Sequence, residues 1–257
     1  MNIKKLGAAF AAAVVAASAV TVTAFSDMRG IEITEERFPD EVFRGYVTEK
    51  FDIDGDGFLS DVERLSVVHI DISDKWRNYN EENKIQSVEG IEYFSYLTVL
   101  ICDKNEISDI DLDSNKRLEV LKCSDNKLTF LDVSNNTELW GLQFNNNKVK
   151  SIDLSNNPEL QFLQCSGNEL TSLDLRYNKK IKDLYCDNNK LNSLDVSRHK
   201  ELRQLNCSGN RLTELNLRKN KRLKYLWCED NYIKSLDISK NNKLRSWTCD
   251  EDVWLIG

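Results

Sequence analysis

A run of acidic residues and glycines near the N-terminus has the residue types and spacing of a calcium-binding loop. Residues 52–63 match the twelve-residue EF-hand pattern at every constrained position, with Gly57 at the sharp turn. Ca²⁺ prefers oxygen ligands, which Asp, Glu, Ser and backbone carbonyls supply. The expected ligands are Asp52, Asp54, Asp56, Phe58, Ser60 and Glu63. Phe58 would contribute its backbone carbonyl, Ser60 would act through a water, and Glu63 would use both carboxylate oxygens.

The residues before this loop predict the helix that must position it. Apolar side chains recur with helical spacing over residues 38–51, and Pro39 suits the first position of a helix. The sequence contains no second loop of this kind, so we expect a calcium site that rigidifies a domain rather than one that senses a signal. The alternative interpretation is an acidic Asp/Gly turn that binds no metal.

Most of the remaining chain is built from a repeat of 21 residues, with the unit L-x-x-L-x-C-x-x-N-x-L-x-x-L-D-L-S-x-N-x-x. The first Leu position is occupied by Leu97, Leu118, Leu139, Leu160, Ile181, Leu202, Leu223 and Leu244. One unit cannot bury its apolar face alone, so neighbouring units must stack around a continuous core. We expect L-x-x-L-x-C to form a strand of a parallel sheet and the second half to be extended rather than helical. The recurrent Asn should lie inside the turn and bind buried backbone groups.

This pattern resembles the leucine-rich repeat family, and in particular secreted bacterial internalin-like proteins with short repeats. The resemblance covers residues 67–257. It implies a leucine-rich repeat solenoid, mainly β with a parallel concave sheet, preceded here by a small helical EF-hand-like cap. We expect full repeats from residue 97 and a partial last repeat over 244–257, where Trp247 and Trp254 should cover the last coil.

All seven cysteines fall on one repeat position, where one unit carries Phe144 instead. Disulfides would suit a secreted protein, but side chains at one position of in-register parallel strands point the same way. We therefore expect buried free thiols and no zinc site. With two histidines and no nucleophile or phosphate-loop motif, the sequence predicts no catalytic residues and no enzyme. The net charge of −7 argues against a nucleic-acid partner.

The strand positions between the inward-facing residues form a candidate binding surface on the concave face. The candidate partner-binding residues are Phe162, Gln164, Asp183, Tyr185, Asn206, Tyr225 and Trp227. Aromatic residues are enriched at binding hot spots, so we predict a protein partner, such as a surface protein. Acidic residues such as Asp187 and Glu229 follow the strands and bases such as Lys179 and Lys221 end the coils, which favours a cationic or polar partner. A carbohydrate ligand is the alternative, and a surface that only solvates the sheet is the third interpretation.

The N-terminal segment predicts the compartment. Residues 1–24 have a positively charged start, an apolar run and small residues before a cleavage point after Ala24, as in a secretory signal peptide. An uncleaved membrane anchor is the alternative. The predicted division is a signal peptide, a helical cap over 25–66 and a leucine-rich repeat domain over 67–257. We expect a secreted, extracellular or cell-surface-associated monomer that binds calcium and has no stable membrane insertion after cleavage.

Overall fold

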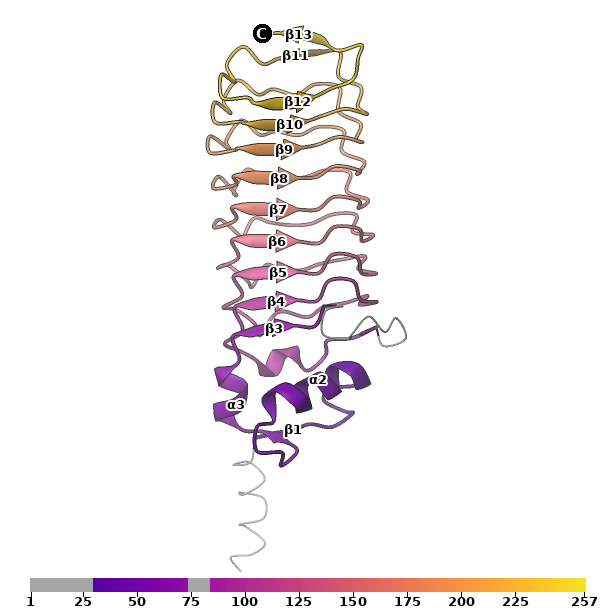
Figure 1. Ribbon diagram of the computed structural model, residues 1–257, viewed down its shortest axis with the longest axis vertical. Helices are drawn as coiled ribbons and strands as arrows, with labels where there is room; N and C mark the ends of the chain where they lie inside the picture. Colours follow the sequence, from indigo (N-terminus) through magenta and orange to yellow (C-terminus); the bar gives the residue numbers. More distant parts are fainter. Residues whose placement is uncertain (1–29, 74–83) are drawn as a thin grey trace, which may run out of the picture.

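The computed structural model describes residues 30–73 and 84–257, which form an elongated stack of coils with a helical unit at the N-terminal end (Figure 1). The elements of this unit are β1 (Ile31–Glu32), α2 (Glu41–Phe51), β2 (Phe58–Leu59) and α3 (Asp61–Ser66). The signal segment over 1–24 lies outside the described residues, as does most of the loop expected between 74 and 84. Within the described segments, none of the helices has the length and apolar character needed to cross a membrane.

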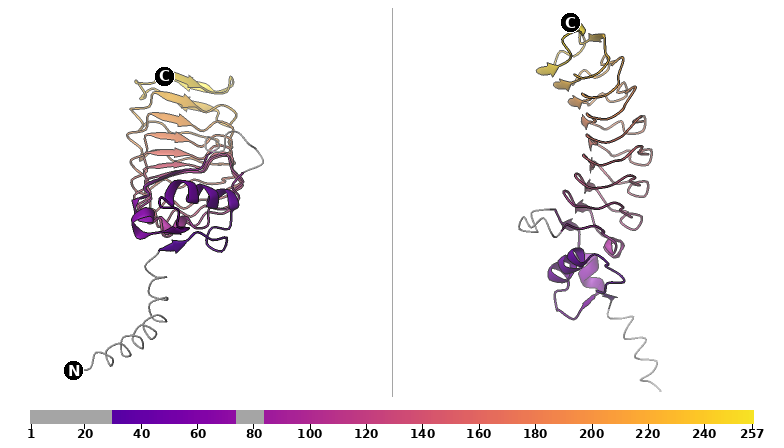
Figure 2. Two further views of the ribbon diagram at one scale, coloured as in Figure 1. Left: turned by 60° about the horizontal axis from the view of Figure 1, so that its bottom comes forward. Right: turned by 90° about the vertical axis from the view of Figure 1, so that its right-hand side faces the viewer.

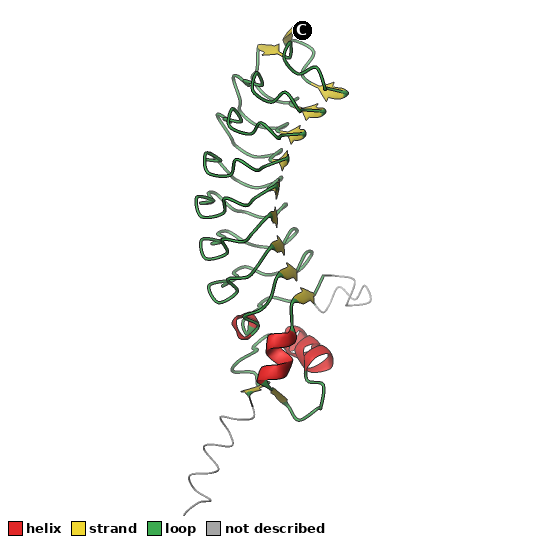
Figure 3. Cartoon of the chain, turned by 90° about the vertical axis from the view of Figure 1, so that its left-hand side faces the viewer, coloured by secondary structure: helices red, strands yellow, loops and turns green. Residues whose placement is uncertain are grey.

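Nine parallel strands form one sheet that runs the length of the stack. They are β3 (His69–Asp71), β4 (Val99–Ile101), β5 (Val120–Lys122), β6 (Gly141–Gln143), β7 (Phe162–Gln164), β8 (Asp183–Tyr185), β9 (Gln204–Asn206), β10 (Tyr225–Trp227) and β12 (Ser246–Thr248). Neighbouring strands pair in register, so Leu163 lies between Leu142 and Leu184. The strands line the inner side of a gentle curve, and the second half-coils form the outer side (Figures 2 and 3).

The outer half-coils contain no α-helix within the described residues, as the repeat predicts, and most of them have no regular secondary structure. Two short elements interrupt them in the described residues: the 3-10 helix η2 (Ile91–Tyr93) and β11 (Ser235–Asp237), which pairs in parallel with β13 (Trp254–Ile256). Side chains alternate across a strand, so the first and third residues of each strand face away from the core. This geometry leaves the concave face free to carry residues that the core does not constrain.

The core is a narrow column made by the repeated apolar positions. Leu118, Leu121 and Cys123 of one coil are fully buried, and the same positions are buried in the neighbouring coils. The cysteines therefore occupy a small buried slot, which Phe144 fills in its own coil. Their thiols donate to the backbone of the following coil, as from Cys102 Sγ to the Lys122 carbonyl at 3.4 Å.

A first row of asparagines fastens each coil to the one before it. Asn126 Nδ2 donates to the carbonyl of its own coil at Cys123 and to that of Cys102 in the preceding coil, at 3.1 and 2.9 Å. Its Oδ1 accepts from the Ile107 N–H at 3.0 Å. The prediction that these residues satisfy buried backbone groups is confirmed by this network.

A second row of buried polar residues lies at the other edge of the coils. Asn136 Nδ2 donates to the backbone carbonyls of Leu112 and Asn115 in the preceding coil, at 3.1 and 2.9 Å. His199 occupies this position in one coil and is 1% exposed. Its ring lies beside the backbone of Leu175 and Asn178 in the preceding coil, but neither ring nitrogen makes a hydrogen bond of good geometry among the described residues.

The two ends of the stack depart from the sequence predictions. The helix before the calcium loop begins at Glu41 rather than Pro39, because Asp40 is extended and its carboxylate caps the first turn. At the other end, the two side chains expected to cover the last coil are themselves open to solvent, with Trp247 42% and Trp254 75% exposed. The chain at β13 pairs with β11 instead of folding over Trp247.

Candidate functional site

The predicted calcium loop lies between α2 and α3, at the end of the molecule opposite the last coil (Figure 1). Its strand β2 pairs antiparallel with β1. In paired EF-hands the partner is a second calcium loop, and here β1 stands in that position. Leu59 of β2 is fully buried, and Gly30 permits the close approach of the two strands. A Cβ on Gly30 would lie 2.0 Å from the Leu59 carbonyl oxygen. The loop is thus held by the helices on both sides and by this strand pair.

Three of the predicted ligands converge in the loop. Asp52, Asp54 and Glu63 each present a carboxylate oxygen within 4.8 Å of the others. Within the described segments, none of the three forms an ion pair with a lysine or arginine. Asp56 instead turns its Oδ1 to the Phe58 N–H at 2.8 Å.

Glu63 is 7% exposed and anchors this arrangement. Its carboxylate accepts from the Ile53 N–H at 2.8 Å, from the Ser60 N–H at 2.8 Å and from the Ser60 hydroxyl at 2.7 Å. Burial alone would raise the pKa of Glu63, but these hydrogen bonds lower it below its ordinary value. Converging carboxylates that no described base neutralises form a donor set that fits a hard divalent cation.

The seven candidate partner-binding residues lie together on β7, β8, β9 and β10, on the face turned away from the core. Their four aromatic rings form two pairs. The ring centroids of Phe162 and Tyr185 are 6.3 Å apart, and those of Tyr225 and Trp227 are 6.1 Å apart with planes inclined by 12°. Strand β9, with polar outward residues, separates the pairs.

Hydrogen bonds between coils hold the polar part of this face. Gln164 Oε1 accepts from Gln143 Nε2 at 2.8 Å, and the Tyr185 hydroxyl donates to Gln204 Oε1 at 2.8 Å. Asp183 differs, because its Oδ1 is buried without a hydrogen-bond partner among the described residues. Burying a carboxylate oxygen without a hydrogen-bond partner costs free energy, and Asp183 Oδ1 is such an atom on this face.

Charge differs between the two edges of the concave sheet. Acidic residues follow the strands, and burial raises the pKa of Asp103 at this edge. Bases precede the strands, and our sequence analysis overlooked the most regular of them. Lys182, Arg203, Lys224 and Arg245 occupy the same repeat position immediately before four successive strands. Comparing that position across the repeats would have found them.

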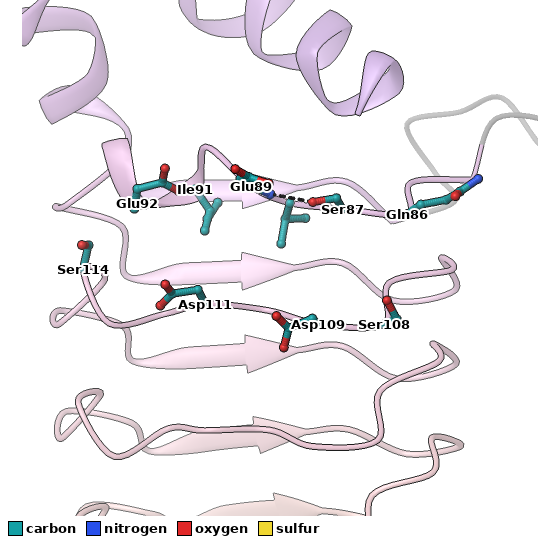
Figure 4. A pocket seen from close by; sticks show the side chains of 10 residues that line it. Gln86, Ser87, Glu89, Ile91, Glu92, Ser108, Asp109, Asp111 and Ser114 are labelled. Atoms are coloured by element: carbon teal, nitrogen blue, oxygen red, sulfur yellow. Dashed lines mark hydrogen bonds between the residues drawn. The ribbon is translucent and has the colours of Figure 1, made fainter. Parts of the chain in front are cut away.

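An open polar cavity of about 420 Å³ lies on the outer side of the first coils, lined by residues from 86 to 92 and from 108 to 114 (Figure 4). Four carboxylates line it, from Glu89, Glu92, Asp109 and Asp111, and no lining residue is basic. One of these carboxylates already binds the backbone, because Glu92 Oε2 accepts a hydrogen bond from the Gly90 N–H at 2.8 Å. The cavity is therefore a feature of the first coils.

Comparisons with known proteins identify the fold. No protein-family model and no curated protein matches the chain. Among solved structures, the functional domain of InlJ from Listeria monocytogenes, described as including a cysteine ladder, is 27% identical with a TM-score of 0.53. The match covers 88% of this chain and 61% of that one.

Two further structures agree. A leucine-rich repeat protein of Leptospira interrogans is 23% identical over 72% of this chain and 49% of its own, with a TM-score of 0.63. Internalin C2 of Listeria monocytogenes is 20% identical over 86% of this chain and 98% of its own, with a TM-score of 0.75. The predicted fold class, a leucine-rich repeat solenoid similar to internalins, is confirmed. The chain spans 61% and 49% of the InlJ and Leptospira structures.

Proposed function

We propose that the chain is a secreted binding protein, not an enzyme, and that it recognises a protein partner through the outward residues of β7 to β10. The observation that carries this proposal is the pair of aromatic clusters on a sheet fixed by its coil-to-coil hydrogen bonds. A rigid aromatic surface loses little conformational entropy when a partner covers it.

The test compares aromatic residues on this face with aromatic residues elsewhere. A Tyr185→Ala, Trp227→Ala variant removes one ring from each cluster. The matched control is Tyr177→Ala, Tyr232→Ala, since both residues are exposed and lie outside the concave strands. An array of extracellular proteins is probed with all three forms. We expect at least a tenfold loss of affinity in the first variant only, and equal binding by both variants would refute the proposal.

Carbohydrate is the second candidate ligand, supported by the near-parallel rings of Tyr225 and Trp227. Flat aromatic faces give sugar rings an apolar surface to stack on. A glycan array run beside the protein array separates the two functions. Binding of neutral glycans that is lost in Trp227→Ala, with no protein bound, would replace the protein partner by a carbohydrate.

We propose in addition that the loop over 52–63 binds Ca²⁺ and rigidifies the N-terminal unit. Support comes from the convergence of Asp52, Asp54 and Glu63 without a neutralising base. Calorimetric titration of Glu63→Gln should show binding lost, while the capping role at α3 survives because Gln also serves in a capping box. Asp61→Asn is the control, since Asp61 pairs with Arg64 and is no expected ligand. Undiminished Ca²⁺ binding by Glu63→Gln would contradict the assignment of this loop as the calcium site.

Secretion is the compartment that this proposal requires. Extracellular calcium modules bind with dissociation constants of about 10⁻⁴–10⁻³ M, which suits a site that stays filled outside the cell. N-terminal sequencing of the protein recovered from the culture medium tests the prediction. A chain starting at Phe25 supports cleavage after Ala24, whereas an intact chain held with the membrane supports the anchor.

A further inference from the structure

Four bases on the surface of the solenoid follow one pairing rule. Residues at one repeat position of neighbouring coils lie side by side, and each of these bases is paired with the acid at its own position in the preceding coil. The pairs are Lys127 with Glu106, Lys180 with Glu159, Lys190 with Glu169 and Arg222 with Glu201. Each joins residues 21 positions apart. Other positions stack like charges, as Asp132, Asp153 and Asp174 do, and such neighbours repel one another.

The edge that precedes strands β8, β9, β10 and β12 breaks this rule. Lys182, Arg203, Lys224 and Arg245 stack directly on one another, with the N–H of each donating to the carbonyl of the one before. In the described part of the chain none of the four forms an ion pair, and Lys182 Nζ donates only to the amide of Gln161. These four residues are called the cationic row below.

A second group of bases runs parallel to the cationic row. Lys179, Lys200 and Lys221 are exposed, occupy one repeat position three residues earlier, and likewise form no ion pair within the described residues. Neighbouring strands lie about 4.8 Å apart, so the cationic row spans about 14 Å. A protein with a net charge of −7 therefore concentrates seven unpaired cations along one straight edge.

We propose that this edge binds a linear anionic polysaccharide that lies along the stack and places its carboxylate or sulfate groups against successive coils. Bases at even intervals on a rigid sheet suit a polymer whose charges repeat evenly, more than a folded acidic protein surface. Tyr225 directly follows Lys224 on β10 and offers a ring beside the row for a sugar to contact. The acidic residues at the opposite edge, such as Asp187 and Glu229, exclude a wide polyanion that would spread across the sheet.

This site lies beside the protein-binding face proposed above and takes a different ligand, so either proposal can fail alone. The probe is a fluorescein-labelled heparin octasaccharide, and the readout is anisotropy at several salt concentrations. The test variant is Arg203→Gln, Lys224→Gln, Arg245→Gln. The control is Lys127→Gln, Lys180→Gln, Lys190→Gln, which removes the same charge from paired positions.

We expect the test variant to bind at least tenfold more weakly and the control to stay within twofold of the unmodified protein. The slope of log affinity against log salt should fall by about 2, because each lost contact releases just under one counterion fewer. Thermal unfolding shows whether the test variant is folded. Absence of heparin binding by the unmodified protein, or an equal loss in both variants, overturns the proposal. Tighter binding of single-stranded DNA or of poly-glutamate than of heparin also overturns it.

Discussion

His199 occupies an asparagine position inside the solenoid, and its burial predicts a stability that depends on pH. Burial lowers the pKa of His199, because the charged ring would lose its hydration. The unfolded chain has a histidine pKa of about 6.5, so below that pH the unfolded state binds more protons. The stability contributed by the neutral ring is therefore complete above the unfolded pKa and is lost as pH falls towards the folded pKa. We expect the free energy of unfolding to drop between pH 7.5 and 5.5.

Substitution isolates this effect from the other titrating groups. Asn220, at the same position one coil later, donates two hydrogen bonds to the preceding coil, at 2.8 and 2.9 Å. The amide of His199→Asn can make the equivalent pair. We expect a gain of about 1–2 kcal/mol at pH 7.5 and a larger gain at pH 5.5. Urea denaturation at both pH values measures it, with the exposed His69→Asn as control. If His199→Asn has the same pH dependence as the unmodified protein, the buried ring is not responsible.

At the scale of structural elements, the buried asparagines of the first row join consecutive coils by hydrogen bonds. Asn168 donates to three carbonyls, including Phe144 O at 2.9 Å in the preceding coil, and accepts from the Val149 N–H at 3.0 Å. Asn168→Ala leaves these groups buried without partners, and we expect a loss of at least about 3 kcal/mol in urea denaturation. Asn156→Ala, at an exposed residue with one hydrogen bond, should change stability by less than about 0.5 kcal/mol. Equal effects would mean that these hydrogen bonds contribute little.

The row of thiols gives a second prediction for an element. Burial raises the pKa of these cysteines, to about 12 for Cys228, whereas Cys249 in the last coil is only partly buried. Thiolates are the reactive species, so iodoacetamide at pH 8 should modify Cys249 first in the folded protein and all seven cysteines after denaturation. Mass spectrometry counts the adducts. Cys249→Ser should abolish the reaction of the folded protein, and Cys165→Ser should leave it unchanged.

Regular elements could be predicted from the sequence because each position is specified many times over. Leu121 and Cys123 recur at fixed spacing, so the strand Val120–Lys122 and its facing followed from alternation alone. Features that occur once could not be predicted in this way. The start of α2 depends on the local conformation of Asp40, and the aromatic pairing of Phe162 with Tyr185 depends on the rotamers of two side chains at different strand positions. The convergence of the calcium loop was expected, but its pairing with β1 was not.

At the scale of the whole molecule, the two ends of the stack differ. The N-terminal unit packs on the first coil, where Asp40 Oδ2 accepts from the Gln86 N–H at 2.7 Å. In the last described coil, Trp247 and Leu255 are each 42% exposed. Stability in such a stack is a sum of coil and interface contributions, so unfolding should begin where the least apolar surface is buried. We expect peptides over 244–257 to exchange amide hydrogens sooner than peptides over 181–206.

Substitutions of buried residues should cost more stability in the middle coils than in the last coil. Leu163 is fully buried between neighbours, and Leu163→Ala should cost about 3 kcal/mol in urea denaturation. Trp247 is 42% exposed although it holds an inward repeat position, so Trp247→Ala should cost less than half as much. Hydrogen exchange followed by mass spectrometry maps the gradient in the unmodified protein. Free strand edges and exposed apolar side chains offer a surface for association. If amide protection is uniform from 181 to 257 and Trp247→Ala is strongly destabilising, the exposed strands at this end are covered in solution.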